Sequence, residues 1–250
     1  MSKNLTDTLR SLDPIGLHEM DKVALMNRVD TKFILHSRLL FAVLENLAIG
    51  YRVLEIAGSR ISGYKNQYFD TKRLKFYTDH HNGKGNRTKV RLREYNNTGI
   101  CYIEVKQKNN KGRTKKTRKK IGGFQPILSD ECIEFVETAA TDDLNNKAVL
   151  FNRFDRVTLV NKNEQERVTI DFNLSFASNS EEMQYPNLAI IEVKQASLSR
   201  NTAIFKYLKS IDIHPYRISK YCLGIASLNG HIKTNLFKEK LRRINKITST

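Results

Sequence analysis

The sequence predicts an α+β fold, namely an antiparallel β-barrel with a charged lumen and surrounding helices. Three observations predict it. Strand-like segments recur along most of the chain without the helical crossovers that parallel sheets need. At least five of these segments place aliphatic side chains on one face and ionised side chains on the other. The pentapeptide IEVKQ occurs twice, at residues 103–107 and 191–195, and both copies show this alternation.

The composition is that of a basic globular protein. At 250 residues the chain is long enough for one large domain with a full core. Its 43 Lys and Arg residues against 26 Asp and Glu residues give a formal charge of +17, which favours a polyanionic partner. Three cysteines, Cys101, Cys132 and Cys222, are too few and too scattered for a disulfide framework or a zinc site, so they indicate a reducing compartment.

No segment of the sequence resembles a membrane anchor. The N-terminal residues lack the apolar stretch of a signal peptide, and no apolar run approaches the length of a membrane span. We therefore expect a cytoplasmic protein, with residues 1–230 forming a single domain and residues 231–250 a basic C-terminal tail. This tail is a candidate for peripheral contact with the inner face of an anionic membrane or with a membrane-protein partner.

The first third of the chain predicts helices around a strand. Asp13 and Pro14 fit the N-cap and the first position of a helix that continues to residue 26. Ser37 is placed to cap a second helix, which Gly50 ends. The strands expected here are residues 27–36, 51–56 and 64–71, followed by a turn or short helix at 72–82.

The rest of the chain predicts further strands with helices between them. Alternating segments indicate strands at residues 88–95, 99–108, 111–121, 150–161, 167–176 and 188–196. Helical periodicity is expected at residues 129–140, with Ser129 as N-cap, at 200–210 and 219–228, and as a frayed helix at 236–250.

An ionised face recurs from strand to strand. Its members are Arg28, Asp30 and Lys32; Lys89, Arg91 and Arg93; Glu104, Lys106 and Lys108; Arg167, Thr169 and Asp171; and Glu192 and Lys194. Arg153 and Arg156 fall on opposite faces of a regular strand, so only one of them can join this set. A solvated basic outer face is one explanation. In a closed lumen these cations would need an anion to neutralise them, and a chain of phosphates with many acceptor oxygens fits that requirement.

The segments RVDTKF, KVRLREY, YIEVKQK, FNRFDR, ERVTIDF, IIEVKQ and RISKYCLG occur in the order and spacing of a known family. Over residues 14–228 they resemble the VTC-type polyphosphate polymerase domain, which belongs to the triphosphate tunnel metalloenzymes. The resemblance implies an antiparallel barrel that encloses a tunnel. It also implies ATP-dependent synthesis of inorganic polyphosphate with release of ADP, and a divalent metal, Mn²⁺ in preference to Mg²⁺.

The resemblance further implies roles for individual residues. Arg91, Arg93, Lys106 and Lys194 would be catalytic, and Glu192 falls at the metal-binding glutamate of the family. The phosphate-binding positions would be Lys32, Arg153, Arg167, Arg217, Ser219 and Lys220, with Lys116 or Arg118 from the basic run. Lys89 joins them because it shares the ionised face of its strand with Arg91 and Arg93.

The first ionised strand departs from the hydrolases of this superfamily, which open with Glu-x-Glu-x-Lys. Here the stretch is Arg28-Val29-Asp30-Thr31-Lys32, and the loss of acids favours a site that grips an anion over a dedicated hydrolase. Two alternatives stay open: a metal-dependent tripolyphosphatase or nucleoside triphosphatase, and a non-catalytic module that binds polyphosphate or nucleic acid. Nucleic acid is the less favoured partner, because the chain has no Trp, no RNA-recognition signature and no Cys/His finger. The absence of a P-loop motif argues against a P-loop NTPase.

Overall fold

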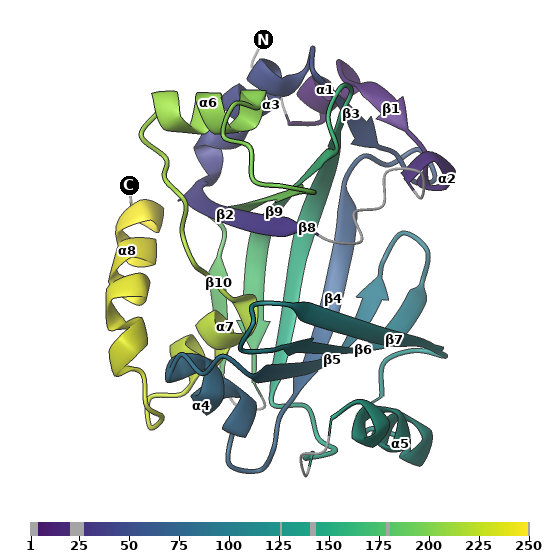
Figure 1. Cartoon of the computed structure of the whole chain (residues 1–250), viewed down its shortest axis with the longest axis vertical. Coiled ribbons are helices and arrows are strands. Elements are labelled where there is room, and N and C mark those ends of the chain that lie inside the picture. The colour runs from purple at the N-terminus through teal and green to yellow at the C-terminus, as the bar shows by residue number, and fades with distance from the viewer. Residues whose placement is uncertain (1–4, 21–27, 126, 141–143, 179–180, 250) are drawn as a thin grey trace.

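The computed structural model is built on one curved sheet of eleven strands, with helices on its outer face and at one end (Figure 1). It describes residues 5–20, 28–125, 127–140, 144–178 and 181–249. The strands are β1 (Asp13–Ile15), β2 (Val29–His36), β3 (Tyr51–Leu54), β4 (Ser62–Phe69), β5 (Arg87–Tyr95), β6 (Ile100–Lys108), β7 (Thr114–Ile121), β8 (Leu150–Asn161), β9 (Glu166–Ala177), β10 (Glu182–Tyr185) and β11 (Leu188–Gln195). The α-helices are α1 (Leu5–Arg10), α2 (Leu17–Met20), α3 (Leu40–Leu47), α4 (Lys75–His81), α5 (Asp130–Ala139), α6 (Ala203–Ser210), α7 (Lys220–Leu228) and α8 (Lys238–Thr248).

The sheet is antiparallel apart from the short parallel pairing of β1 with β3. Its strand order is β2-β11-β9-β8-β4-β5-β6-β7, with β10 added beside β9 and β3 beside β8. This confirms the expected α+β class with an antiparallel sheet, a charged inner face and surrounding helices. Among the described strands no ladder joins β2 to β7, so the sheet curves around its interior and leaves these two edges unpaired with each other.

Helices cover the outer face of the sheet where the aliphatic side chains lie. Phe33 of β2, Ile170 of β9 and Ile191 of β11 belong to one buried cluster with Leu44 of α3 and Leu208 of α6. On the other half of the sheet, the aliphatic faces of β5 and β6 are buried against α5 in a second cluster. Burial of these faces outward leaves the ionised faces of the same strands pointing inward.

Helix α7 occupies one end of the interior. Its apolar side chains pack on the inner face of β4, β8 and β9, in a cluster that includes Phe154 and Phe176. The approach is so close at Gly224 that an added Cβ would lie 2.5 Å from a Phe176 ring carbon and 2.7 Å from Leu150 Cδ2. A residue without a side chain at this position therefore lets α7 sit deep inside the sheet.

A β-bulge in β9 allows this strand to serve both halves of the interior. The register between β8 and β9 shifts between Arg153 and Asp155, opposite Asn173, whose φ of 52° lies in the left-handed region. The bulge adds one residue and so reverses the alternation. Asp171, before it, and Phe176, after it, consequently face the same interior space, the first beside other charges and the second against α7.

The structure corrects two local expectations near the N-terminus. Asp13 and Pro14 do not begin a helix but lie in β1, paired in register with β3; residues 21–26 of that expected helix lie outside the described part of the chain. Pro fits this short edge strand because its missing N–H is not needed for a ladder on the outer side. Ser37 does not cap the next helix, because the ring nitrogen Nδ1 of His36 accepts the hydrogen bond from the Arg38 N–H instead. Strands β1 and β10 were not anticipated.

The basic C-terminal segment, expected to fray, forms helix α8 against the sheet. Ile244 is fully buried, and α8 shares its apolar cluster with α7. The Asn187 side chain donates to the carbonyl of Thr248, which fixes the end of the helix near β11. Across the described residues, none of the helices has the length and apolar character required to cross a membrane.

Candidate functional site

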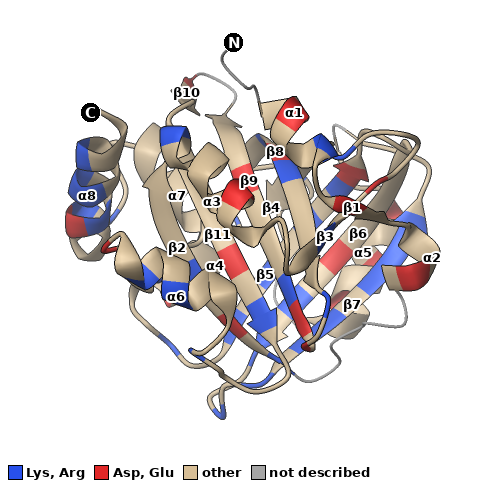
Figure 2. Cartoon of the chain, turned by 90° about the horizontal axis from the view of Figure 1, so that it is seen from above, with Lys and Arg blue, Asp and Glu red and all other residues tan. Residues whose placement is uncertain are grey.

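The inner face of the sheet lines a cavity of about 590 Å³, which reaches from α2 and β3 at one end to α7 at the other. Lysine and arginine dominate the lining: among the described residues twelve of them line it against two carboxylates, Asp30 and Glu192. Figure 2 shows Lys and Arg in blue along β5 and β7, and this lining includes Lys89, Arg91 and Arg93 of β5 and Lys116 and Arg118 of β7. In a chain that also carries a net charge of +17, such a cavity is suited to a polyanion.

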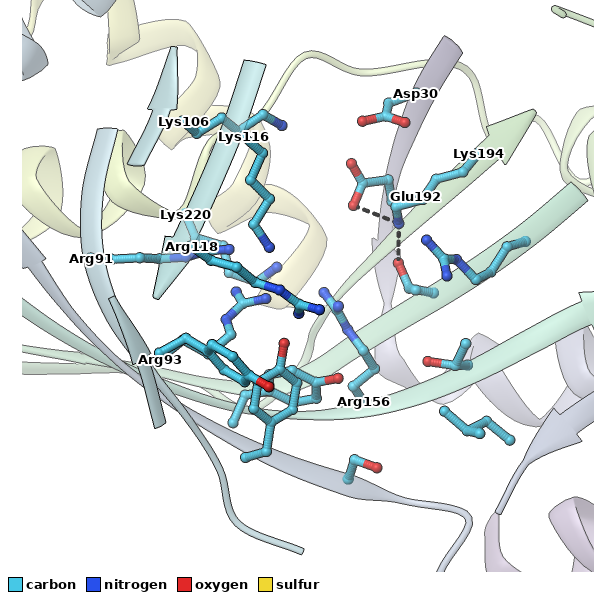
Figure 3. Close-up of a pocket in the computed structure, with 18 of the residues that line it drawn as sticks. Asp30, Arg91, Arg93, Lys106, Lys116, Arg118, Arg156, Glu192, Lys194 and Lys220 are labelled. Carbon is cyan, nitrogen blue, oxygen red and sulfur yellow. Dashed lines mark hydrogen bonds and ion pairs between the residues drawn. The ribbon is translucent and has the colours of Figure 1, made fainter. Parts of the chain in front are cut away.

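Two walls of the sheet face each other across this space (Figure 3). Lys116 and Arg118 of β7 extend from one wall, and Asp30 and Glu192 extend from β2 and β11 on the other. Arg156 of β8 lies between the walls. Because these strands are far apart in the chain, the curvature of the sheet is what brings the two copies of IEVKQ, in β6 and β11, to opposite sides of one cavity.

Glu104 of the first copy is a buried anchor for two cations. Its Oε2 accepts from Arg91 Nε at 2.8 Å and Nη2 at 2.6 Å, and its Oε1 accepts from Lys116. The ladder explains the contact with Arg91, which pairs directly with Glu104. On the other side Glu104 pairs with Arg118, and Lys116 reaches it from the diagonal position on β7. Burial alone would raise the pKa of Glu104, but Arg91, Arg93 and Lys116 outweigh burial and hold this pKa far below its usual value. Glu104 therefore stays ionised and orients the guanidinium of Arg91.

Asp171 anchors a second pair of cations. Its carboxylate accepts from Arg156 Nε at 2.5 Å and from Arg156 Nη2 at 2.8 Å, and it also accepts from Lys220 of α7. Only 2% of the Asp171 side chain is exposed. Burial alone would raise its pKa, and Arg156 and Lys220 overcome that effect and lower the pKa well below normal. The two-point contact fixes the Arg156 fork, so its remaining N–H groups are held in place for a ligand.

Glu192 of the second copy differs from Glu104 because it lines the cavity itself. Its Oε2 lies 3.0 Å from Lys194 Nζ, and its Oε1 lies 3.8 Å from Lys32 Nζ. Lys194 Nζ also donates to Thr169 Oγ1 at 3.0 Å. Although burial alone would raise the pKa of Glu192, Lys194, Lys32 and Arg156 lower it well below the usual value.

Five cations of the lining have no carboxylate within ion-pairing distance among the described residues: Lys89, Arg93, Lys106, Arg118 and Arg167. Lys89 donates to Ser219 Oγ at 2.9 Å, and Arg93 donates to Asn66 Oδ1 at 2.9 Å. The Nε of Arg167 is buried without a hydrogen-bond partner. Arg93 is buried and Lys89 and Arg167 are half-buried, whereas Lys106 and Arg118 are exposed. The buried cationic groups are costly to leave without a partner, and an anion in the cavity would satisfy them.

Tyrosine rings support the arginines from below. The guanidinium of Arg93 lies 5.1 Å from the Tyr64 ring centre, and that of Arg118 lies 4.7 Å from the Tyr102 ring centre. At the α7 end, the hydroxyl of Tyr221 donates to the buried Asp70, which also accepts from the N–H groups at the start of α4. Stacking and capping of this kind restrict the side chains to the orientation in which they face the cavity.

Most of the site residues expected from the sequence lie together on this lining. They are Lys32, Lys89, Arg91, Arg93, Lys106, Lys116, Arg118, Arg167, Glu192, Lys194, Ser219 and Lys220. Both alternatives in the basic run are included, because Lys116 and Arg118 alternate with outward-facing residues along β7. Their roles in binding or catalysis stay predictions, whereas their convergence is a property of the structure.

Two expected residues lie elsewhere. Arg153 is exposed on the outer face of β8, opposite Lys65, and Arg156 takes the inward position on that strand. The two-residue period of a strand allowed only one of these two arginines to face the cavity. The register of β8 with β4 places Arg156 beside Ser62, and Arg156 is the one that faces inward. Arg217 is exposed and outside the lining; together with burial and Arg87 it lowers the pKa of Lys240 on α8.

The sequence also left four contributors without a role. Arg156 and Asp171 lie on strands that the sequence identified as ionised. Only the pairing of β8 with β9 shows that the two residues form one ion-paired unit. Tyr64 and Tyr102 gave no signal beyond strand propensity. Their function as platforms depends on which arginine the neighbouring strand places above them.

The carboxylates fit a divalent cation that shares its ligands with a substrate. Among the described residues, no group of three or more His, Cys, Asp or Glu side chains is close enough to hold a metal alone. Glu192 and Asp30 lie on adjacent strands, with Glu192 opposite Lys32 and Asp30 opposite Lys194, so the two are diagonal neighbours on the inner face. Mg²⁺ and similar hard cations commonly use one or two carboxylates and complete their coordination with phosphate oxygens and water.

The family model for the VTC domain matches residues 27–229, which include every strand that lines the cavity. The chain belongs to the VTC domain family. This family has the fold of the triphosphate tunnel metalloenzymes, so a site for phosphate compounds and a divalent metal are family properties. No curated protein matches this VTC domain significantly in sequence.

Solved structures with related folds are distant from this VTC domain. A candidate adenylate cyclase from Vibrio parahaemolyticus is 14% identical with a TM-score of 0.45, covering 78% of this chain and 95% of its own. A candidate adenylyl cyclase from Hippeastrum with a dominant triphosphatase activity is 15% identical with a TM-score of 0.46, covering 82% of this chain and 97% of its own. A protein from Pyrococcus horikoshii is 13% identical with a TM-score of 0.45, covering 80% and 96%. At these values the likenesses carry no argument about activity.

Proposed function

We propose that this VTC domain synthesises inorganic polyphosphate from ATP. The observation that carries the proposal is the set of cations without a carboxylate partner, placed between two charged walls of one cavity. A binding site for a single phosphate would need only two or three of them. A row of cations from Arg93 through Arg91 to Lys89 along β5, and from Arg118 to Lys116 along β7, suits a row of phosphates.

Phosphoryl transfer asks the protein mainly for positioning and for neutralisation of charge. Arg91 and Arg156, each held at two points by a buried carboxylate, would clamp the triphosphate of ATP. Lys106 and Lys194 would neutralise charge on the phosphoryl group in transit. An oxygen of the terminal phosphate of the growing chain attacks the γ-phosphorus, a new P–O bond forms, the bond to the β,γ-bridging oxygen breaks, and ADP leaves.

Glu192, with Asp30 beside it, would hold the divalent metal, and the metal would supply charge neutralisation between neighbouring phosphate oxygens. Lys194 and Lys32 now contact Glu192 and would turn to the phosphates when the carboxylate takes on the metal. Mn²⁺ is the ion that we favour, with Mg²⁺ as the alternative for the same oxygen ligands.

Hydrolysis of tripolyphosphate or of nucleoside triphosphates would use the same clamp with water in place of the acceptor phosphate. Water needs a base, and the two carboxylates of the lining are poorly suited to that task. Glu192 is paired with Lys194 and Lys32 and has a strongly lowered pKa, and Asp30 is paired with Arg28 at 2.9 Å. A terminal phosphate is already an anion and needs no base, which favours the polymerase.

The direct test is incubation of the purified protein with γ-labelled ATP and Mn²⁺, followed by separation of the products on a gel. We expect a ladder of phosphate chains together with ADP in equal amount to the phosphate transferred. Release of free phosphate without a ladder would instead establish a hydrolase. Tight binding of polyphosphate with no turnover would establish a binding module.

The lysines of the cavity make binding dependent on pH. Burial, with neighbouring cations, lowers the pKa of Lys89 to about 7, and burial is the main cause that lowers the pKa of Lys194 and Lys220 to about 8. In the empty cavity these groups are partly neutral above their lowered pKa values. A polyanion favours their charged forms and raises these pKa values again.

Binding of tripolyphosphate is therefore expected to take up protons at about pH 8.5. The affinity for tripolyphosphate should fall as the pH rises through the lysine pKa values. Near about pH 6 the lysines are already charged, so uptake by them should vanish. Calorimetric titrations in two buffers with different ionisation enthalpies measure the proton count directly. Proton release near pH 8.5, or affinity that increases with pH, would contradict the prediction.

A further inference from the structure

The cations on the inner face of β5 and β6 continue past the residues that line the cavity. In the ladder between these strands Lys89 pairs with Lys106, and both line the cavity. Two residues further along the ladder, Arg87 pairs with Lys108. Because side chains alternate along a strand, Arg87 and Lys108 face the same concave side of the sheet. At about 3.4 Å per residue they lie about 7 Å beyond the lining.

The turn between β6 and β7 adds two cations at this end of the molecule. It carries Lys111 and Arg113, and both side chains are exposed. The Asn110 N–H donates to Asn86 Oδ1 at 2.9 Å, so the turn packs on the residue that precedes β5. This contact holds the two cations near the start of β5, where Arg87 lies.

These cations raise the positive potential outside the cavity. Among the described residues, four of them have no carboxylate within ion-pairing distance, and we call these four the outer basic surface: Arg87, Lys108, Lys111 and Arg113. The potential reaches a neighbouring helix, because burial, followed by Lys89 and Arg87, lowers the pKa of His80 on α4 to about 2. A group of like charges without counter-charges is suited to a polyanion.

We propose that the outer basic surface binds the part of a polyphosphate chain that extends out of the cavity. The inference rests on the proposed function and adds a second region of contact to it. On β5 the step from Lys89 to Arg87 equals the step from Arg91 to Lys89, two residues in each case. A row of phosphates that follows the cations of β5 inside the cavity therefore meets the next cation at the same interval outside it. Chains that are too short to leave the cavity do not reach this surface.

An anionic membrane fits the outer basic surface less well than a flexible chain does. The exposed turn with Lys111 and Arg113 would be attracted to a charged bilayer. Arg87, however, is half-buried on the concave side of the sheet. A chain of phosphates can follow a concave face, whereas a flat bilayer would contact the turn alone.

The test compares the binding of tripolyphosphate with that of a long polyphosphate chain, by calorimetry without ATP or metal. The triple variant Lys108→Gln, Lys111→Gln and Arg113→Gln removes three charges at exposed positions. We expect the affinity for the long chain to fall about tenfold or more, and the affinity for tripolyphosphate to stay within about twofold. The slope of log affinity against log salt concentration should become shallower by about 2 for the long chain, because each phosphate contact of a single-stranded polyanion contributes about 0.7.

The matched control is the triple variant Arg200→Gln, Lys206→Gln and Lys209→Gln. It lowers the net charge by the same amount at exposed positions on and just before α6. Helix α6 lies at the upper end of the view in Figure 1, away from β6 and β7. This control should keep its affinity for the long chain and for tripolyphosphate within about twofold.

Three results would overturn the proposal. Equal losses of long-chain affinity in the two triple variants would show a general effect of net charge. A loss for tripolyphosphate as large as the loss for the long chain would place the substituted residues in the cavity site. Unchanged binding of the long chain, together with weaker binding to vesicles that contain phosphatidylserine, would assign the surface to a membrane. Failure of the proposed function is seen separately, as an absence of phosphate chains in the product assay, because this comparison of affinities involves no turnover.

Discussion

Glu192→Gln is expected to reduce the rate of polyphosphate synthesis by about 100-fold or more, the scale seen when one preorganised electrostatic contact is removed from a transition state. The substitution keeps the shape of the side chain but removes the charge that would hold the metal. It also releases Lys194 and Lys32, which contact the carboxylate at 3.0 and 3.8 Å. Metal-free binding of tripolyphosphate should therefore be as tight as in the unaltered protein, or tighter.

Two measurements decide this prediction, namely the initial rate of ADP release with Mn²⁺ and the dissociation constant of tripolyphosphate without metal. Glu164→Gln is the matched control, because Glu164 is exposed in the turn between β8 and β9, away from the cavity lining. A synthesis rate that stays unchanged in Glu192→Gln would remove Glu192 from the mechanism. Weaker metal-free binding would show that the carboxylate serves the phosphate site in some other way.

Arg156→Ala is expected to weaken tripolyphosphate binding and to slow synthesis by about tenfold or more, whereas Arg153→Ala should leave both within about twofold. The two arginines are three residues apart on β8, but only Arg156 faces the cavity. Because a phosphate clamp acts on substrate and transition state alike, both the affinity and the rate should change. The pair of variants thus tests the register of the strand as well as the role of the residue.

Loss of Arg156 also leaves Asp171 buried with Lys220 as its remaining cation. Removing one partner of a buried ion pair can cost about 3–5 kcal/mol of folding free energy, so thermal unfolding of the variant should be measured beside its affinity. Arg156→Lys retains the charge without the two-point fork. Compared with Arg156→Ala, it should therefore restore more of the folding stability than of the affinity for tripolyphosphate. If Arg153→Ala were the more damaging variant, the inward position of Arg156 would be wrong.

The two glutamates of the repeated pentapeptide show which features of the site the sequence pattern predicts and which it does not. Alternation correctly placed Glu104 and Glu192 on inward faces, because the two-residue period of a strand is a local property. It did not distinguish their surroundings. Glu104 is covered by Arg91 and Lys116, whereas Glu192 remains on the lining, and this difference depends on which strands lie opposite each copy.

The wrong placements of residues from the sequence have the same cause, namely contacts between distant parts of the chain. Arg153 and Arg156 were equivalent by composition and spacing, and the choice between them came from the pairing of β8 with β4. Asp13 and Pro14 carried a helix-start signal, but pairing with β3 stabilises an extended conformation there, since tertiary contacts override weak local preferences. The bulge at Asn173, which turns Phe176 inward after Asp171, had no signal in the two-residue pattern.

The sequence by itself determined that the chain forms ionised, two-faced strands, that its cations outnumber its acids, and that it resembles the VTC domain family. The first two properties follow from residue type and from the period of a strand, and the resemblance follows from the order and spacing of the motifs; none of them needs knowledge of distant contacts. Only the tertiary structure decided which walls face each other and where each carboxylate is buried. These depend on long-range pairing and on the packing of α7 against the sheet, where Gly224 permits an approach that no larger residue would allow.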